Sequence, residues 1–149
     1  MISAGRAGLL LDTGPLVAYL YPRDAYHDWA LEQFSRLDPP FLTCQPVITE
    51  ACFLLVRNGL AAAHVLETIE RGVVSLAFSM ADHIPGLRRL IDRYANVPMS
   101  LADACLVRMA ELVDLPICTL DADFAIYRAH GRRPLRLISP AFRPGLHEP

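Results

Sequence analysis

The chain has 149 residues, of which 53% are hydrophobic and 20% are charged, so it fits one domain with a sizeable core and is not a disordered protein. Its formal net charge is −2, which excludes a polycation built as a whole for nucleic acid. No apolar run approaches the ~18 residues of a membrane helix, and the run before Asp12 is too short for a secretory signal. We therefore expect a soluble, cytoplasmic protein without a membrane segment.

Along the first half of the chain, short apolar segments alternate with segments whose apolar residues recur at helical spacing. We predict a short buried strand at 8–12, helices at 15–21 and 24–37, a second strand at 41–44 and a strongly apolar helix at 46–57. Pro15 fits the first turn of the first helix, and Asn58-Gly59 ends the apolar one.

The second half continues the alternation. We predict a helix at 60–71, a third strand at 73–78 and a helix that ends near Tyr94. A helix at 101–113, capped by Ser100, a fourth strand at 116–120, a short helix starting at Asp121 and a fifth strand at 135–138 follow. Short apolar strands separated by helices favour a parallel sheet covered on both faces. We expect one domain over residues 1–149, with a core at about 8–139 and a short tail at 140–149.

Two acids follow predicted strands directly. Asp12 comes after the first strand and Asp121 after the fourth. Ligands of open parallel sheets bind at the carboxyl ends of the strands, near the point where the strand order reverses. If these two strands are neighbours, as a sheet with a central first strand requires, the two carboxylates meet.

Three more acids stand in apolar or strand-end contexts. Glu50 is the only charge in "VITEACFLLV", and Asp103 is followed by Leu106 and Val107 on its side of a helix. Asp123 lies in "CTLDADF", two residues after Asp121. Each acid also has a structural explanation, because Asp12, Asp103 and Asp121 stand where helix caps occur and Glu50 could favour the helix dipole.

A shared cation explains the acids together. Carboxylates that converge in one pocket repel one another unless a divalent ion lies among them, and oxygen ligands without Cys or His suit Mg²⁺ or Mn²⁺. Such a site can activate water for attack on a phosphodiester. An aspartate-nucleophile phosphatase is disfavoured, because it needs a second acid where the chain has Gly14 and a lysine that the chain lacks.

All fourteen basic residues are arginine. One cluster contains Arg88, Arg89 and Arg93, and the other, in an acid-free segment from Phe124 to Leu146, contains Arg128, Arg132, Arg133, Arg136 and Arg143. Either cluster can be a solvated surface or a rim that binds phosphate, which the planar guanidinium suits. The absence of lysine also excludes a P-loop.

The four cysteines form no CxxC pair and lie among apolar neighbours, at positions 44, 52, 105 and 118. We expect reduced, buried thiols and no zinc site.

Four acid-bearing segments, in this order and at these distances, resemble the PIN-domain ribonucleases, most closely the VapC-type toxins of bacterial toxin–antitoxin pairs. The segments are "LLLDTGPLVAYL", "PVITEACFLL", "MSLADACLVRMAE" and "ICTLDADF", and the resemblance extends from about residue 8 to 139. It implies an α/β fold, a three-layer α/β/α sandwich whose five-stranded parallel sheet has the order 3-2-1-4-5, and Mg²⁺- or Mn²⁺-dependent cleavage of RNA.

The same resemblance implies roles for individual residues. Asp12, Glu50, Asp103 and Asp121 match the acidic quartet, with Asp12 and Asp103 as the firmest metal ligands. Three further residues match supporting positions of the site: Thr13, Thr119 and Asp123. The arginines expected to hold the RNA backbone are Arg128, Arg132 and Arg133.

The resemblance also implies partners. VapC-type proteins form homodimers and are inhibited by an antitoxin whose C-terminal segment lies in a groove, to which helices 46–57 and 60–71 would contribute. Two alternatives remain open: a stand-alone PIN nuclease in RNA processing, and a non-catalytic PIN-like module that binds RNA or protein.

Overall fold

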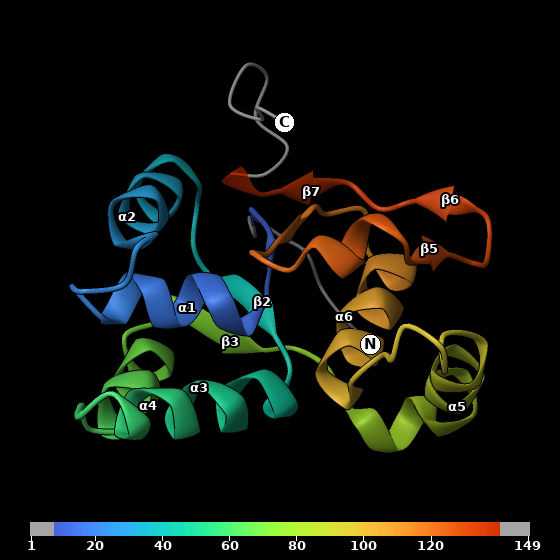
Figure 1. Cartoon of the computed structure of the whole chain (residues 1–149), viewed down its shortest axis with the longest axis horizontal. Helices are drawn as coiled ribbons and strands as arrows, with labels where there is room; N and C mark the ends of the chain where they lie inside the picture. Colours follow the sequence, from blue (N-terminus) through green and yellow to red (C-terminus); the bar gives the residue numbers. More distant parts are fainter. Residues whose placement is uncertain (1–7, 141–149) are drawn as a thin grey trace.

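A five-stranded parallel sheet forms the centre of the protein in the computed structural model, which describes residues 8–140 (Figure 1). Its order is β3-β2-β1-β4-β7, and its strands are Val74–Leu76, Phe41–Thr43, Leu10–Leu11, Ile117–Cys118 and Leu137–Ile138. Leu10 pairs with Leu42 on one side and with Ile117 on the other. The predicted order 3-2-1-4-5 is confirmed, with β7 as the predicted fifth strand, and the first and fourth strands are neighbours.

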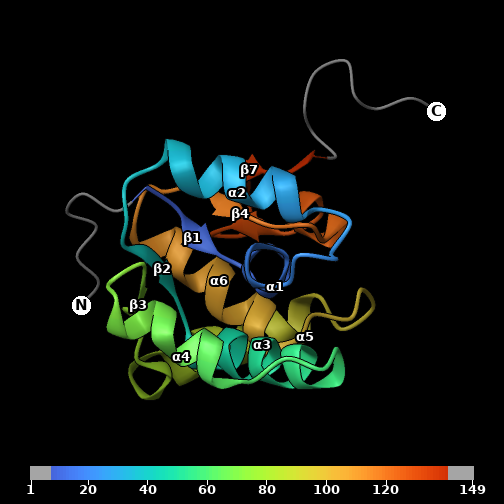
Figure 2. The same cartoon turned by 90° about the vertical axis from the view of Figure 1, so that its left-hand side faces the viewer.

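Six α-helices flank this sheet (Figures 1 and 2). In chain order, α1 to α6 are Thr13–Leu20, His27–Arg36, Gln45–Arg57, Ala63–Glu70, Ile84–Arg93 and Leu101–Leu112. Helix α1 packs against α2 and α3, and α5 packs against α6. The α/β fold predicted from the alternation of strands and helices is therefore confirmed. None of the helices in residues 8–140 has the length and apolar character needed to cross a bilayer.

Buried leucines explain the central position of β1. Leu9, Leu10 and Leu11 are completely inaccessible to solvent, which is typical of a parallel strand covered on both faces. Helix α6 packs on β1 and has eight buried residues, so it is apolar around most of its circumference. The site residues at the ends of β1 and α6 are consequently held by the best-packed part of the molecule.

One predicted helix boundary was wrong for an identifiable reason. The helix expected from residue 24 begins at His27, because the Asp24 side chain accepts a hydrogen bond from the Tyr26 backbone N–H and forms a turn. The helix expected to end near Tyr94 is confirmed as α5, with Pro85 in its first turn, and an unpredicted 3-10 helix η1 (Met80–His83) precedes it.

A small antiparallel hairpin was not predicted. It pairs β5 (Arg128–Ala129) with β6 (Arg133–Pro134), and its turn contains His130 and Gly131, both with positive φ. Of the tail predicted at 140–149, residues 141–149, with Arg143, lie outside the described residues.

Truncation of the central strand should therefore destabilise the fold strongly. Leu10→Ala is expected to lower the free energy of unfolding by about 2–5 kcal/mol, because the side chain is fully buried. The control, Leu31→Ala on α2, removes the same atoms from a side chain that is 43% exposed and should cost well under ~1 kcal/mol. Equal losses in urea unfolding would contradict this account of the core.

Candidate active site

Asp12 stands at the carboxyl end of β1 and is the N-cap of α1. Its Oδ1 accepts a hydrogen bond from the Thr13 backbone N–H at 2.8 Å, and its Oδ2 accepts one from Thr119 Oγ1 at 2.6 Å. Thr119 follows β4 and also accepts a hydrogen bond from the Asp121 backbone N–H. The carboxylate is 7% exposed, so its orientation is fixed by both strands.

Asp103 approaches from the opposite side, in the first turn of α6. It forms a reciprocal capping box with Ser100, as its sequence position allows. Its Oδ2 accepts hydrogen bonds from the Ser100 backbone N–H at 3.3 Å and from the Tyr127 hydroxyl at 2.9 Å. Oδ1 has no hydrogen-bond partner among the described residues, so it is available to a ligand in the adjoining cavity.

The other acids are more accessible than the sequence argument assumed. Glu50 and Asp121 are exposed and Asp123 is half-buried. Phe53, three residues after Glu50 on the same side of α3, is 64% exposed. Asp121 accepts a hydrogen bond from the Asp123 backbone N–H and caps the 3-10 helix η2 (Ala122–Ala125), while Glu50 makes only a long 3.5 Å contact with Thr13 Oγ1.

One cavity of about 450 Å³ collects these carboxylates. The acids that line it are Asp12, Glu50, Asp103, Asp121 and Asp123. Thr13 lines it too, whereas Thr119 lies behind Asp12 and is completely buried. No arginine or histidine is among the described residues that line the cavity, so nothing in its walls neutralises the five negative charges.

The pKa values of the carboxyls reflect this lack of compensation. Burial raises the pKa of Asp12 from 3.8 to about 7, against the opposing hydrogen bonds of Thr119 and Thr13. Burial also raises the pKa of Asp103, with a contribution from the charge of Asp121. Burial and the charge of Asp103 raise the pKa of Glu50.

The donor chemistry of this cavity fits a hard divalent cation. It offers carboxylate oxygens from three helical segments and one sheet edge, and no sulfur or imidazole ligand. In residues 8–140, no three Asp, Glu, His or Cys side chains converge closely enough to form a metal site as they stand. The fit therefore rests on the donor set and the uncompensated charge.

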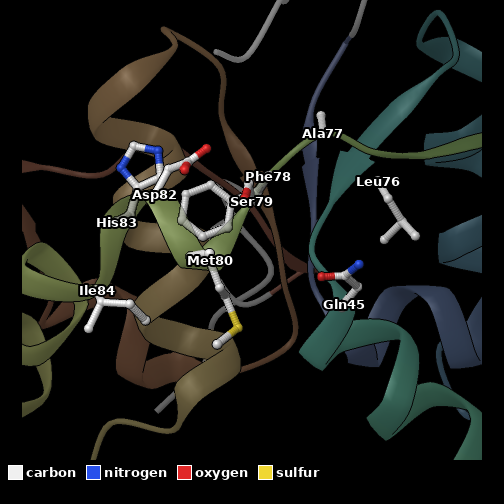
Figure 3. A pocket seen from close by; sticks show the side chains of 10 residues that line it. Gln45, Leu76, Ala77, Phe78, Ser79, Met80, Asp82, His83 and Ile84 are labelled. Carbon is white, nitrogen blue, oxygen red and sulfur yellow. The ribbon is translucent and has the colours of Figure 1, made fainter.

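A cavity of about 850 Å³, larger than the acidic one, lies elsewhere, at the end of β3 (Figure 3). Leu76 and Gln45 lie on one of its walls, and Phe78 and His83 on the other. Among the described residues that line it, only Asp82 and His83 are titratable, so carboxylates gather in the smaller of these two cavities.

The arginines expected to contact RNA do not line the acidic cavity. Arg128 donates from Nη1 to the backbone carbonyls of residues 125–127 at the end of η2. Arg132 and Arg133 line a different cavity, beside the C-terminal end of α6. Any role of these three arginines in binding RNA is therefore exerted away from the carboxylates.

Sequence reasoning missed Tyr127. Its side chain is fully buried and its hydroxyl contacts Asp103, 24 residues earlier in the chain. The one available signal was general, since a buried tyrosine hydroxyl needs a polar partner. Nothing local could have identified that partner.

All four cysteines are free thiols in the described residues. Cys44, Cys105 and Cys118 are buried, as predicted, whereas Cys52 is only half-buried and departs from the prediction.

A comparison with models of protein families matches residues 9–129 to the model described as the PIN domain. No curated protein matches the chain.

Burial of Asp12 should make stability depend on pH when divalent ions are chelated. Because its folded pKa, about 7, exceeds its unfolded value of 3.8, the folded protein binds more protons between these values and loses stability as pH rises. The slope from this group is at most about 1.4 kcal/mol per pH unit. We expect urea unfolding in EDTA to show this decline between about pH 5 and 7.

Asp12→Asn removes the titrating group and is the control. It should flatten the pH dependence, although it also loses one of the two hydrogen bonds that the carboxylate accepts. Parallel curves for the parent and the variant would show that Asp12 is not the buried group responsible.

Proposed function

Because the chain belongs to the PIN-domain family, a family of nucleases, we propose that it is a metal-dependent ribonuclease and the toxin of a VapC-type toxin–antitoxin pair. One observation carries the catalytic part of this proposal: five carboxylates line one cavity, and no basic side chain is among its lining residues within 8–140. PIN domains generally use a divalent metal. The proposed substrate is RNA, and the proposed cofactor is Mg²⁺ or Mn²⁺.

The proposed metal ligands are Asp12, Glu50, Asp103 and Asp121. When bound, the metal supplies positive charge that activates a water for attack on a phosphodiester and stabilises the departing oxygen. Asp12 and Asp103 are the firmest candidates, because buried hydrogen bonds fix both carboxylates. Glu50 and Asp121 are exposed, so they can adjust to the ion and the substrate.

Thr119, Thr13 and Tyr127 are proposed positioning residues. Thr119 holds Asp12 Oδ2, and Tyr127 holds Asp103 Oδ2, so each carboxylate is oriented by a buried hydroxyl. Thr13 contributes its backbone N–H to Asp12 and its hydroxyl to the long contact with Glu50. Asp123 lines the same cavity and is proposed as an auxiliary acid.

The toxin role adds a cognate antitoxin and a homodimer to the proposal. Helices α3 and α4 expose Phe53, Val56 and Leu66, which are 64%, 59% and 52% accessible. Exposed apolar side chains on neighbouring helices support a surface for protein contacts. Co-purification with the product of an adjacent short reading frame would test this part, and a monomer that binds no such protein would contradict it.

Asp103→Asn should abolish RNA cleavage, because it removes one charge and one ligand from the cavity. An amide oxygen at the Oδ2 position keeps the hydrogen bonds from Ser100 and Tyr127, so the fold should be preserved. The expected loss is at least ~100-fold in the rate of Mg²⁺- or Mn²⁺-dependent cleavage of single-stranded RNA.

Asp28→Asn, the same change at an exposed position on α2, is the matched control and should cleave RNA at the parent rate. Cleavage that persists in Asp103→Asn, or in the parent protein with excess EDTA, would refute the proposed mechanism.

Tyr127→Phe should weaken activity and move its pH dependence. The tyrosine hydrogen bond lowers the pKa of Asp103, so its removal raises that pKa and shifts the acid limb of the pH–rate profile to higher pH. The lost hydrogen bond should cost about 1 kcal/mol, a several-fold change in rate. Tyr26→Phe, at a 45% exposed position, should change neither quantity. A purely structural role would lower stability and leave the pH profile in place.

A further inference from the structure

The two arginine clusters of the sequence meet beside the C-terminal half of α6. A cavity of about 270 Å³ lies between α5, α6 and the turn of the β5–β6 hairpin, and its charged or titratable lining is Arg89, Arg93, Arg108, Glu111 and His130. Glu111 and His130 also line the adjoining cavity that contains Arg132, Arg133 and Asp114, the last of which pairs with Arg136 at 2.9 Å. Residues from distant parts of the sequence thus form one basic surface.

Among the described residues that line this cavity, the one carboxylate is already engaged. Glu111 Oε1 accepts a hydrogen bond from Arg108 Nη1 at 3.0 Å, and its Oε2 accepts one from the His130 backbone N–H at 2.7 Å. No ion pair involves Arg89 or Arg93 in residues 8–140. Three guanidinium groups against one carboxylate leave two positive charges with His130 neutral.

Two glycines allow the guanidinium groups to approach so closely. A Cβ on Gly86 would lie 3.4 Å from Arg108 Nε and 3.8 Å from Arg89 Nη2, so both guanidinium groups pass over the same bare backbone. A Cβ on Gly131 would lie 2.6 Å from Arg93 Nη1, and the φ of Gly131 is +72°. Arg108 is further fixed by Glu111 and by a long 3.4 Å contact with His83 Nδ1.

We propose that this cavity binds a phosphate group of the RNA backbone. Guanidinium groups donate in a planar fork that matches phosphate oxygens, and a net positive cavity with its carboxylate engaged favours an anion. Arg108 follows Asp103 by five residues on α6, about 7.5 Å along the helix axis. At 3.6 residues per turn the two side chains are also about 140° apart around the helix, so the cavity lies on a different face of α6 from the carboxylates and holds a phosphate other than the one that is cleaved.

This inference rests on the proposed ribonuclease function for its substrate, and its test requires no cleavage. The binding of a labelled single-stranded RNA is measured by fluorescence anisotropy in EDTA, in the Asp103→Asn background, over a range of salt concentrations. Arg89→Gln and the double variant Arg89→Gln/Arg93→Gln are compared with Arg88→Gln, a change on the same helix outside the cavity. Circular dichroism checks that each variant is folded.

The double variant should bind RNA roughly tenfold more weakly, and the slope of log affinity against log salt should fall by about 0.7 for each phosphate that the variant no longer neutralises. Arg89→Gln should show an intermediate loss, and Arg88→Gln should match its parent. Equal binding by the double variant and its parent, or an equal loss in Arg88→Gln, would overturn the proposal.

Inorganic phosphate tests the other source of the same chemistry. If phosphate raises thermal stability through Arg89 and Arg93 while RNA affinity is unaffected by the double variant, the cavity binds a free anion and the proposal fails. If the parent protein cleaves RNA but the double variant binds RNA as tightly as its parent, the phosphate site is refuted and the ribonuclease function stands. If the parent protein never cleaves RNA but the double variant loses RNA binding, the ribonuclease function is refuted and the phosphate site stands.

Discussion

The hydrogen bond between Thr119 Oγ1 and Asp12 Oδ2 is the constraint on which the site depends. It joins the ends of β1 and β4, two neighbouring strands whose pairing is fixed by fully buried leucine, isoleucine and cysteine side chains. Both carboxylate oxygens accept hydrogen bonds, and burial raises the pKa of Asp12 to about 7. A charge at this apolar edge is costly, and the proposed shared cation would offset that cost.

Acidic and basic side chains are separated along helix α6. Asp103, at the start of α6, faces the acidic cavity, whereas Arg108 and Glu111, in its second half, line the arginine cavity. Because α6 has eight buried residues and packs against β1 and α5, the fold holds the two cavities at a fixed separation, on different faces of the helix.

Local patterns allowed the alternation of strands and helices to be predicted, and apolar runs ending in Asp12 and near Asp121 located β1 and β4. That these two strands are neighbours was only a condition of the residue argument, and the strand order followed from the family resemblance, because sheet order depends on how distant segments pack. The exposure of Glu50 and the contact from Tyr127 could not be predicted, since both depend on how distant helices pack. The capping roles of Asp12 and Asp103 proved compatible with a place in the cavity, so those explanations were not exclusive.

The convergence of the carboxylates on one ion is the central claim, and a crystal structure of the protein soaked in Mn²⁺ tests it most directly. The account predicts an anomalous difference peak in the cavity, at roughly 2.0–2.3 Å from carboxylate oxygens of Asp12 and Asp103, with Glu50 or Asp121 completing the ligands. The same soak of Asp103→Asn should show no such peak. A saturating soak with no peak between these acids, or a peak bound only by other residues, would contradict the account.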